Sequence, residues 1–428
     1  MTPVSPLATI ERLAQERADQ LALDLNGPEG LDRLGRLVSE TVERWNAEHR
    51  DGRRPVALDD DVIDRALRNL VGYGPLGPLL EDDDVWEIMV NAPDALFVKR
   101  HRGADGAHDE VFHDDDHVLR VLSRVLDDAT GAHRKLDPTL GLQDAQLANG
   151  ARLHIVHRDL SRGGHTMVNI RKFTGVAYRR LEDLVATGML DGPTAELLAS
   201  LVRGGTSLVV AGRPGAGKTT LLSCCVAELD PRARVVVAEE VFEAEVPVAN
   251  VAGMQTRGPR PDRPEIGLRR LVAAFLRMAP DVAIVGEVRN REALPLLLTL
   301  SSGVTGYTTV HAGSAAQALT RLRFICQLAE EATNLGAATL TTLVAEAIDV
   351  VVHCTRAADG PRVTEVLAVE DLATGDSGRF TTTPLVVRNH PDRPLQWSGL
   401  VPERLTARLA ARGVDLGPIL SRGGRVER

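Results

Sequence analysis

The sequence contains little cysteine, and its cysteines do not form a recognisable metal or disulfide pattern. Only 4 occur among 428 residues, at positions 224, 225, 326 and 354, and none forms a C-x-x-C pair. This argues against a disulfide framework and against a zinc site. No run approaches the ~18 consecutive apolar residues of a membrane span, and the N-terminus lacks the basic start and apolar run of a signal peptide. We therefore expect a cytoplasmic protein.

Aromatic residues are also scarce, and acidic residues outnumber basic ones. Phe, Trp and Tyr occur 7, 3 and 3 times, and the formal net charge is −9. A surface that binds nucleic acid needs a basic groove or aromatic side chains on which bases stack. We therefore expect no nucleic-acid partner. The chain is long enough for two or three domains with cores of their own.

Lysine occurs at only four positions, and one of them, Lys218, lies in a phosphate-binding motif. Residues 212–219 read GRPGAGKT and match G-x-x-x-x-G-K-[ST]. The apolar run 206–211 predicts a buried strand before the motif, and residues 219–229 predict a helix after it. Glycines then let backbone N–H groups surround a phosphate, while the lysine and a threonine reach the β/γ-phosphates and Mg²⁺. The expected ligands are ATP and Mg²⁺, bound by Gly212, Arg213, Pro214, Gly215, Ala216, Gly217, Lys218, Thr219 and Thr220.

Acidic residues and a histidine stand at the ends of three later apolar runs. Three carboxylates lie within residues 239–243, Glu287 follows the run 281–285, and His311 follows the run 307–310. In a parallel nucleotide-binding sheet the carboxyl ends of the strands face the ligand. We expect Glu287 to hold the Mg²⁺ water shell opposite Thr219 and His311 to donate a hydrogen bond to a phosphate oxygen. Taken alone, the first group also fits a solvated acidic turn, and the histidine also fits a structural role.

Three acidic runs, at residues 59–61, 82–84 and 114–116, raise the alternative of a separate metal site. Two of them stand where helices are expected to begin. Aspartate there accepts hydrogen bonds from free backbone N–H groups and complements the helix dipole. The third run lies in an expected turn. We favour these capping and turn roles over metal binding.

The patterns divide the chain into five parts. Residues 1–55 predict a helical N-terminal segment, because apolar residues recur every three or four positions. Residues 56–175 predict a smaller α+β domain with strands near 85–90, 95–100, 151–157 and 166–172 and a helix at 115–129. After a linker at 176–192, strands and helices alternate over 193–370, which predicts an α/β domain with a parallel sheet covered on both faces. Residues 371–428 predict a weakly patterned C-terminal tail.

The order of the motifs resembles a known series. The phosphate loop, VAEEVFE at 237–243, VGEVR at 285–289 and TTVHAG at 308–313 look like the Walker A, Asp box, Walker B and His box of the type II/type IV secretion ATPases. Within that superfamily the chain is most similar to the Flp/Tad pilus-assembly branch. Further segments resemble the N-terminal domain of that branch: GYGPL at 72–76, EIMVN at 87–91, NGAR at 149–152 and NIRKF at 169–173. The resemblance covers roughly residues 59–370.

The resemblance implies a hexameric ATPase whose RecA-like core follows an α+β N-terminal domain, with the nucleotide between the two. It implies that Glu243 positions the attacking water, that Glu287 completes the Mg²⁺ shell and that His311 senses the γ-phosphate. Arg152 and Arg171 match arginines that close over the phosphates. The implied partner is an inner-membrane platform protein of a secretion or pilus system, so the protein would lie peripherally at the inner face of the membrane. The remaining alternatives are a RecA-like nucleic-acid translocase and a nucleotide-binding switch without turnover.

The chain departs from the family pattern at three places. Glu240 stands where the Asp box usually has aspartate. Ser302-Gly303-Val304 replaces the Thr-Gly-His that begins the His box, and the four-cysteine zinc module of many type II relatives is absent. The last difference favours the Flp/Tad branch. Between the boxes, residues 267–279 predict one helix with Leu268, Val272 and Leu276 on its apolar face and Arg270 and Arg277 on another.

Overall fold

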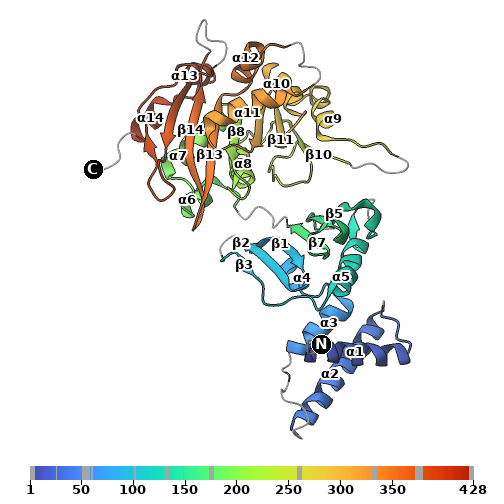
Figure 1. Ribbon diagram of the computed structural model, residues 1–428. Helices are drawn as coiled ribbons and strands as arrows, with labels where there is room; N and C mark the ends of the chain where they lie inside the picture. Colours follow the sequence, from blue (N-terminus) through green and yellow to red (C-terminus); the bar gives the residue numbers. More distant parts are fainter. Residues whose placement is uncertain are drawn as a thin grey trace. The chain divides into compact units, whose positions relative to one another are not determined.

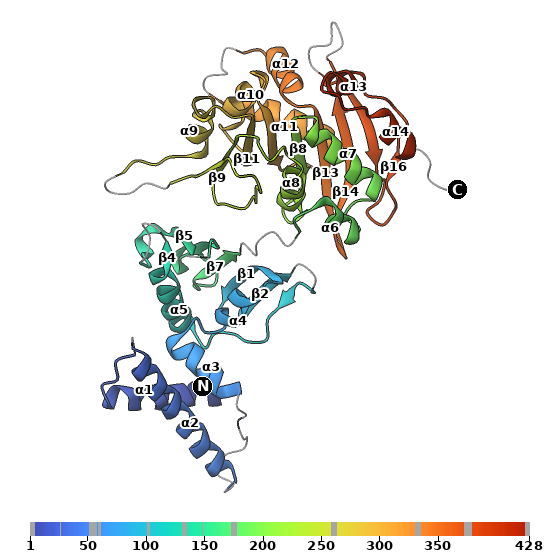
Figure 2. The same ribbon diagram turned by 180° about the vertical axis from the view of Figure 1, so that it is seen from behind.

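The computed structural model describes residues 5–25, 27–50, 58, 61–100, 103–130, 135–147, 149–172, 178–257, 263–329, 335–371 and 379–423. The chain forms two compact units, an N-terminal unit at Met1–Thr174 and a C-terminal unit at Gly175–Arg428. The N-terminal unit combines helices with a small sheet, and the C-terminal unit is built around a larger sheet (Figures 1 and 2). None of the described helices is long and apolar enough to cross a lipid bilayer.

The N-terminal unit begins with three helices: α1 (Pro6–Gln20), α2 (Pro28–Arg50) and α3 (Asp61–Val71). Leu34, Val38 and Val42 recur every four residues along α2, and they are buried together with Ile10 of α1 and Ala66 of α3. The helical character predicted for the first 50 residues is confirmed. The structure adds α3 to this bundle, because α2 contacts both α1 and α3, whereas the sequence pattern grouped residues 61–71 with the α+β domain.

A seven-stranded antiparallel sheet follows, in the order β3-β2-β1-β7-β6-β5-β4 among the described residues. Residues of one sheet face pack against α4 (Leu76–Glu81) and α5 (Asp115–Asp127), since Ile88, Ile155 and Ile170 are buried with Leu79 and Val121. The predicted α+β character is confirmed, and β3, β4 and β5 are additional strands. The strands are β1 (Val85–Ala92), β2 (Ala95–Arg100), β3 (Gly106–Ala107), β4 (Ala129–Thr130), β5 (Leu142–Leu147), β6 (Arg152–Val156) and β7 (Met167–Arg171).

The acidic runs of this unit have local structural roles. Asp114 is the N-cap of α5, and its side chain accepts a hydrogen bond from the backbone N–H of His117. Asp82 accepts from the N–H of Asp84 and pairs with Arg100 at 2.6 Å. The predicted capping and turn roles are therefore confirmed for these two runs. Asp59 and Asp60 of the remaining run lie outside the described residues.

The C-terminal unit is organised by a sheet with the order β10-β9-β11-β12-β8-β13-β14-β15-β16 in the described part of the chain. In this order, the six strands from β10 through β13 pair in parallel, and β14, β15 and β16 extend the sheet with antiparallel pairs. The predicted α/β class with a RecA-like core is confirmed. The strands are β8 (Leu208–Gly212), β9 (Val235–Glu239), β10 (Val251–Gln255), β11 (Val282–Val288), β12 (Thr305–Val310), β13 (Val350–Ala357), β14 (Gly360–Val369), β15 (Thr382–Val387) and β16 (Gln396–Trp397).

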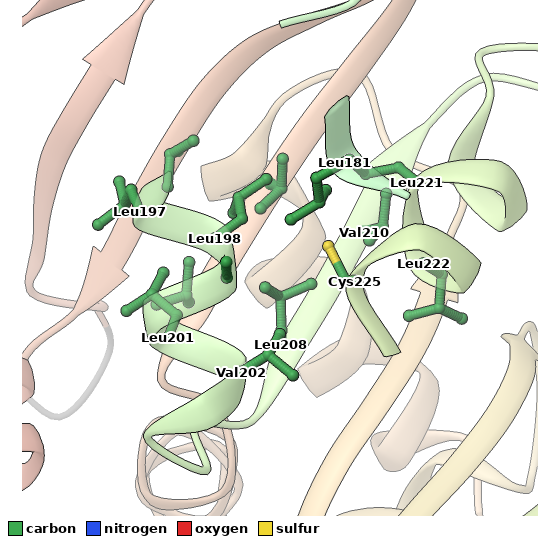
Figure 3. Close-up of a cluster of buried hydrophobic side chains, with 14 of the residues drawn as sticks. Leu181, Leu197, Leu198, Leu201, Val202, Leu208, Val210, Leu221, Leu222 and Cys225 are labelled. Carbon is green, nitrogen blue, oxygen red and sulfur yellow. The ribbon is translucent and has the colours of Figure 1, made fainter. Parts of the chain in front are cut away.

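Helices cover both faces of this sheet. Successive residues of a strand point to opposite faces, so each strand contributes side chains to two buried clusters. Leu208 and Val210 of β8 join one buried cluster, and Val209 and Ala211 join the other. The first cluster is shown in Figure 3, where side chains of α7 and α8 surround β8. It contains residues of α6 (Leu181–Ala186), α7 (Gly192–Arg203) and α8 (Lys218–Val226). The second contains residues of α9 (Leu268–Val272), α10 (Ala293–Ser301), α11 (Ala315–Gln327) and α12 (Ala337–Ala347).

Two regions expected to lie outside the core belong to it. In the expected linker at 176–192, Leu181 and Leu184 of α6 and the following Met189 are buried in the first cluster. In the expected tail, β15 pairs with β14, and helices α13 (Glu403–Ala410) and α14 (Gly417–Gly423) follow. Leu405 and Leu409 of α13 are buried in the same cluster. Short elements between Pro, Gly and Arg residues carry weak periodicity, so the sequence pattern did not show them.

The C-terminal end of α13 is tied to the sheet by arginines. Arg408 donates to the carboxylate of Asp349, whose other oxygen accepts from the N–H of Ser207 at 2.7 Å. Arg412 donates to the carbonyl oxygens of Gly204 and Gly205 at 3.0 and 2.8 Å. Ser207 and Asp349 immediately precede β8 and β13, so α13 is anchored where these strands begin.

The helix predicted at 267–279 is interrupted. The α-helix α9 ends at Val272, and a 3₁₀ turn occupies Phe275–Met278 before Ala279 at φ 49°. The tighter turn changes the direction of the following side chains. Leu276 is consequently 55% exposed, although the 3.6-residue period placed it on the buried face.

Candidate functional site

A loop with two obligatory glycines joins β8 to α8. A Cβ atom on Gly212 would lie 2.4 Å from the carbonyl oxygen of Cys354 on β13. Gly217 is the N-cap residue of α8 with φ 80°, and a Cβ atom there would lie 2.9 Å from Cβ of Pro361. Any larger residue would be strained at either position. Residues 212–217, with the first turn of α8, are called the phosphate loop below.

The phosphate loop fits a bound anion. The N-terminus of α8 has no side-chain cap and no acidic residue in its first turn. Its N–H groups and the helix dipole are therefore available to a negative group. Thr219 and Thr220 lie half-buried in this turn, and a threonine hydroxyl is an oxygen donor of the kind that Mg²⁺ prefers. The residues present thus fit a nucleotide phosphate with Mg²⁺.

Lys218 points toward the tip of the neighbouring strand. Its ammonium group donates to the carbonyl oxygen of Arg213 at 3.1 Å and lies 3.2 Å from Nδ1 of His311. His311 follows β12, which pairs in parallel with β8. The two carboxyl strand ends therefore place the lysine and the histidine side by side, as their positions in the sequence predicted.

His311 links the lysine to Glu287. Its Nε2 lies 2.8 Å from Oε1 of Glu287 on β11, the strand next to β12. Burial, and then the positive charge of Lys218, lower the pKa of His311. A neutral imidazole protonated at Nε2 donates to the carboxylate and accepts from Lys218 at Nδ1, whereas the other tautomer donates from Nδ1 to the carbonyl oxygen of Gly212 at 3.2 Å. The start of α8 and the ends of the neighbouring strands β12 and β11 thus contribute one contact chain, from Lys218 through His311 to Glu287.

Arg289 completes the environment of Glu287. Its Nε and Nη2 donate to the two carboxylate oxygens of Glu287 at 2.6 and 3.0 Å, and its Nη1 lies 3.3 Å from Oε2 of Glu240. Burial alone would raise the pKa of Glu287, but the hydrogen bond and charge of Arg289, with His311 and Lys218, hold it below its usual value. The carboxylate is therefore ionised and engaged on both oxygens.

Glu239 shapes the turn that carries Glu243. The Glu239 side chain is 2% exposed, and its Oε1 accepts from the backbone N–H groups of Glu243 and Ala244 at 3.1 and 3.0 Å. A Cβ atom on Gly286 would lie 2.9 Å from Glu239, so β9 and β11 are in contact here.

The hydrogen bond to Glu287 raises the pKa of Arg289, and the charges of Glu240 and Glu243 add to this effect. Glu243 therefore lies within electrostatic range of Arg289.

Arg152 and Arg171 belong to the N-terminal unit. They are direct partners across β6 and β7, and Glu87 of β1 stands opposite Arg171 in the same row. Leu153 and Ile170, the neighbours in sequence, point into the buried core. By the alternation of strand side chains, both arginines lie on the sheet face that is not part of this core.

The position that begins the His box is remote from His311. Val304 immediately precedes β12, and His311 immediately follows it, so the two are separated by roughly 20 Å of extended chain. Gly303 and Thr305 line a cavity of about 330 Å³ at this end of the sheet. The first histidine of the His box, replaced here by Val304, is therefore not needed for the contacts of His311 with Lys218 and Glu287.

Sequence reasoning identified Lys218, Glu287 and His311, which the structure brings together. It assigned no role to Arg289 or Glu239. The sequence did contain a signal for Arg289, which stands two residues after Glu287, because residues two apart at the end of a strand point to the same side. No comparable signal marked Glu239, since its two backbone partners depend on the conformation of the following turn.

Comparisons with known proteins show the family of this chain. The family model described as "Type II/IV secretion system protein" matches residues 69–392. The chain is 32% identical over 314 residues to a Mycobacterium tuberculosis (strain H37Rv) protein named for conjugal transfer, covering 72% of this chain and 86% of that protein. It is 30% identical to the type IV secretion system protein PtlH of Bordetella pertussis, covering 70% of this chain and 94% of PtlH.

Two solved structures are also similar. The VirB11 ATPase of the Brucella suis type IV secretion system is 25% identical with a TM-score of 0.36, and the match covers 71% of this chain and 97% of that one. The ATPase DotB of Yersinia pseudotuberculosis is 15% identical with a TM-score of 0.48, covering 80% of this chain and 90% of that one.

Proposed function

Because the chain belongs to the type II/IV secretion system protein family, we propose that it is an ATP-hydrolysing motor for protein secretion or pilus assembly at the inner membrane. The observation that carries this proposal is the contact chain of Lys218, His311 and Glu287 beside the phosphate loop. A structural cluster would not need a lysine at the start of α8 beside a histidine and an acid at two adjacent strand ends, around a loop suited to phosphate.

The proposed roles follow from the chemistry of the side chains. Lys218 and the N–H groups of the phosphate loop hold the β/γ-phosphates of ATP, while Thr219 and Glu287 hold Mg²⁺ and its water shell. When bound, Mg²⁺ would offset the negative charge of the phosphates. Glu243 orients the attacking water, and His311 donates a hydrogen bond to the γ-phosphate in place of its present bond to Glu287.

The motor function also needs parts beyond this site. We propose that Arg152 and Arg171 of the N-terminal unit act on the phosphates during turnover, so that hydrolysis is coupled to movement of that unit. We further propose a homo-oligomer, a hexameric ring, that lies peripherally at the cytoplasmic face of the membrane and acts on a platform protein. The names of two relatives, which refer to conjugal transfer and type IV secretion, support a role in secretion.

Within the family, we propose the Flp/Tad pilus-assembly branch. The motifs GYGPL at 72–76 and NGAR at 149–152 and the absence of the four-cysteine module support this choice. A nucleic-acid translocase is the main alternative, and stimulation of the ATPase by single-stranded DNA would favour it.

Replacing the proposed water-orienting acid tests the mechanism. Glu243→Gln should lower the ATPase rate at least about tenfold, or ~1.4 kcal/mol in the barrier, because the amide cannot polarise water as a carboxylate does. Nucleotide binding should persist. The readout is Mg²⁺-dependent phosphate release, followed by complementation of a deletion strain, in which surface filaments or the secreted protein should remain absent.

Glu245→Gln is the matched control, since Glu245 lies in the same turn and is 44% exposed beside Arg179. Its turnover should equal that of the wild-type protein. Normal turnover in Glu243→Gln would remove the proposed role of this acid. A deletion strain with normal filaments and normal secretion would contradict the motor function.

A further inference from the structure

Arg289 joins the tips of two strands through two carboxylates. Its guanidinium group donates to both oxygens of Glu287, which lies on β11, and its third nitrogen lies 3.3 Å from Glu240, directly after β9. Such forked contacts hold a carboxylate in one orientation. The arginine therefore determines where the Glu287 carboxylate points.

The same contacts compete with the proposed role of Glu287. One carboxylate oxygen is shared by Arg289 and His311, and the other is bound to Arg289. The negative charge of Glu287 is thus already paired with a fixed cation. For this acid to hold the Mg²⁺ water shell, it has to give up part of its contact with Arg289.

Glu240 offers Arg289 a second acceptor. The side chains of Arg289 and Glu240 are 42% and 46% exposed, whereas that of Glu287 is 21% exposed. Arg289 already bridges the two acids, so a shift toward Glu240 breaks only its two hydrogen bonds to Glu287. Glutamate instead of the usual aspartate lengthens the arm by about one C–C bond, ~1.5 Å, and thereby brings its oxygen to Arg289.

We propose that Arg289 is a positioning residue that shifts from Glu287 to Glu240 when nucleotide and Mg²⁺ fill the phosphate loop. The inference rests on the proposed role of Glu287. In this arrangement Glu240 contributes to Mg²⁺-dependent binding only through Arg289. Shortening Glu240 leaves the arginine on Glu287 and weakens the contribution of Mg²⁺.

The test measures binding rather than turnover. The dissociation constant of a fluorescent ATP analogue, mant-ATPγS, is determined with Mg²⁺ and with EDTA. The constant in EDTA divided by the constant with Mg²⁺ reports the Mg²⁺ contribution. Glu240→Asp should reduce this ratio about threefold, the size expected for one half-exposed ion pair, and leave binding in EDTA unchanged. In an Arg289→Gln background the same change should have no effect, because the residue through which it acts is gone.

An equal effect of Glu240→Asp in both backgrounds, or no effect in the wild-type background, would overturn the inference. Glu245→Asp controls for shortening an acid in the same turn, and thermal unfolding of each variant controls for folding. Glu287→Gln separates the two proposals. If Glu287→Gln abolishes the Mg²⁺ contribution but the effect of Glu240→Asp does not depend on Arg289, only the role of Arg289 is wrong. If Glu287→Gln leaves the Mg²⁺ contribution unchanged, the roles of both Glu287 and Arg289 are wrong.

Discussion

Lys218→Ala should lower the ATPase rate by about 10²–10³-fold, equivalent to ~2.7–4 kcal/mol in the barrier, the cost of removing one preorganised donor from developing charge. Lys218 is 7% exposed, and its ammonium group already lies between the carbonyl oxygen of Arg213 and the ring of His311. It therefore needs only a small displacement to reach a phosphate in the loop. The measurement is phosphate release at saturating ATP and Mg²⁺.

Lys135→Ala is the matched control, since Lys135 is an exposed lysine of the N-terminal unit. It should turn over ATP at the wild-type rate. Thermal unfolding should show that Lys218→Ala remains folded, because the lysine packs at the edge of a site and not in a core cluster. Substantial turnover in a folded Lys218→Ala protein would mean that hydrolysis takes place elsewhere.

Leu409→Ala should destabilise the C-terminal unit by about 2–5 kcal/mol, the usual cost of truncating a fully buried leucine. Leu409 of α13 is 0% exposed, and its Cδ2 lies 2.1 Å from where a Cβ atom on Gly204 would be. The substitution leaves a cavity between α13 and the end of α7. Chemical denaturation monitored by circular dichroism measures the free energy of unfolding.

Leu400→Ala serves as the control for this region, because Leu400 is 51% exposed. It should change the free energy of unfolding by less than about 0.5 kcal/mol. Equal, small effects of the two substitutions would show that residues 403–410 behave as a tail, as the sequence pattern suggested, and that the anchoring through Asp349 and Arg408 adds little.

The sequence predicted the site best where chemistry and strand periodicity coincide. Lys218 is part of a fixed motif, and Glu287 and His311 each stand at the end of an apolar run. Parallel pairing places the carboxyl ends of such runs at one edge, so their proximity followed from topology alone. This reasoning does not depend on side-chain conformation, and the contacts of His311 with both other residues agree with it.

Features that depend on local backbone geometry could not be predicted. Glu239 acquires its role from a turn whose N–H groups point back at it, and Leu276 is exposed because an α-helix changes to a 3₁₀ turn. Arg152 and Arg171 are 19 residues apart, and their pairing requires the register of β6 against β7, which the spacing alone does not fix. The burial of Leu405 and Leu409 depends on distant partners, including β14, that no local pattern identifies.

The most direct test of the account is an experimental structure of the full chain with Mg²⁺ and a non-hydrolysable ATP analogue. The account predicts the triphosphate in the loop at 212–220, with Lys218 and His311 in hydrogen-bond contact with the γ-phosphate and Glu287 reaching Mg²⁺ directly or through one water. A nucleotide bound elsewhere, or Glu287 and His311 directed away from the triphosphate, would contradict it.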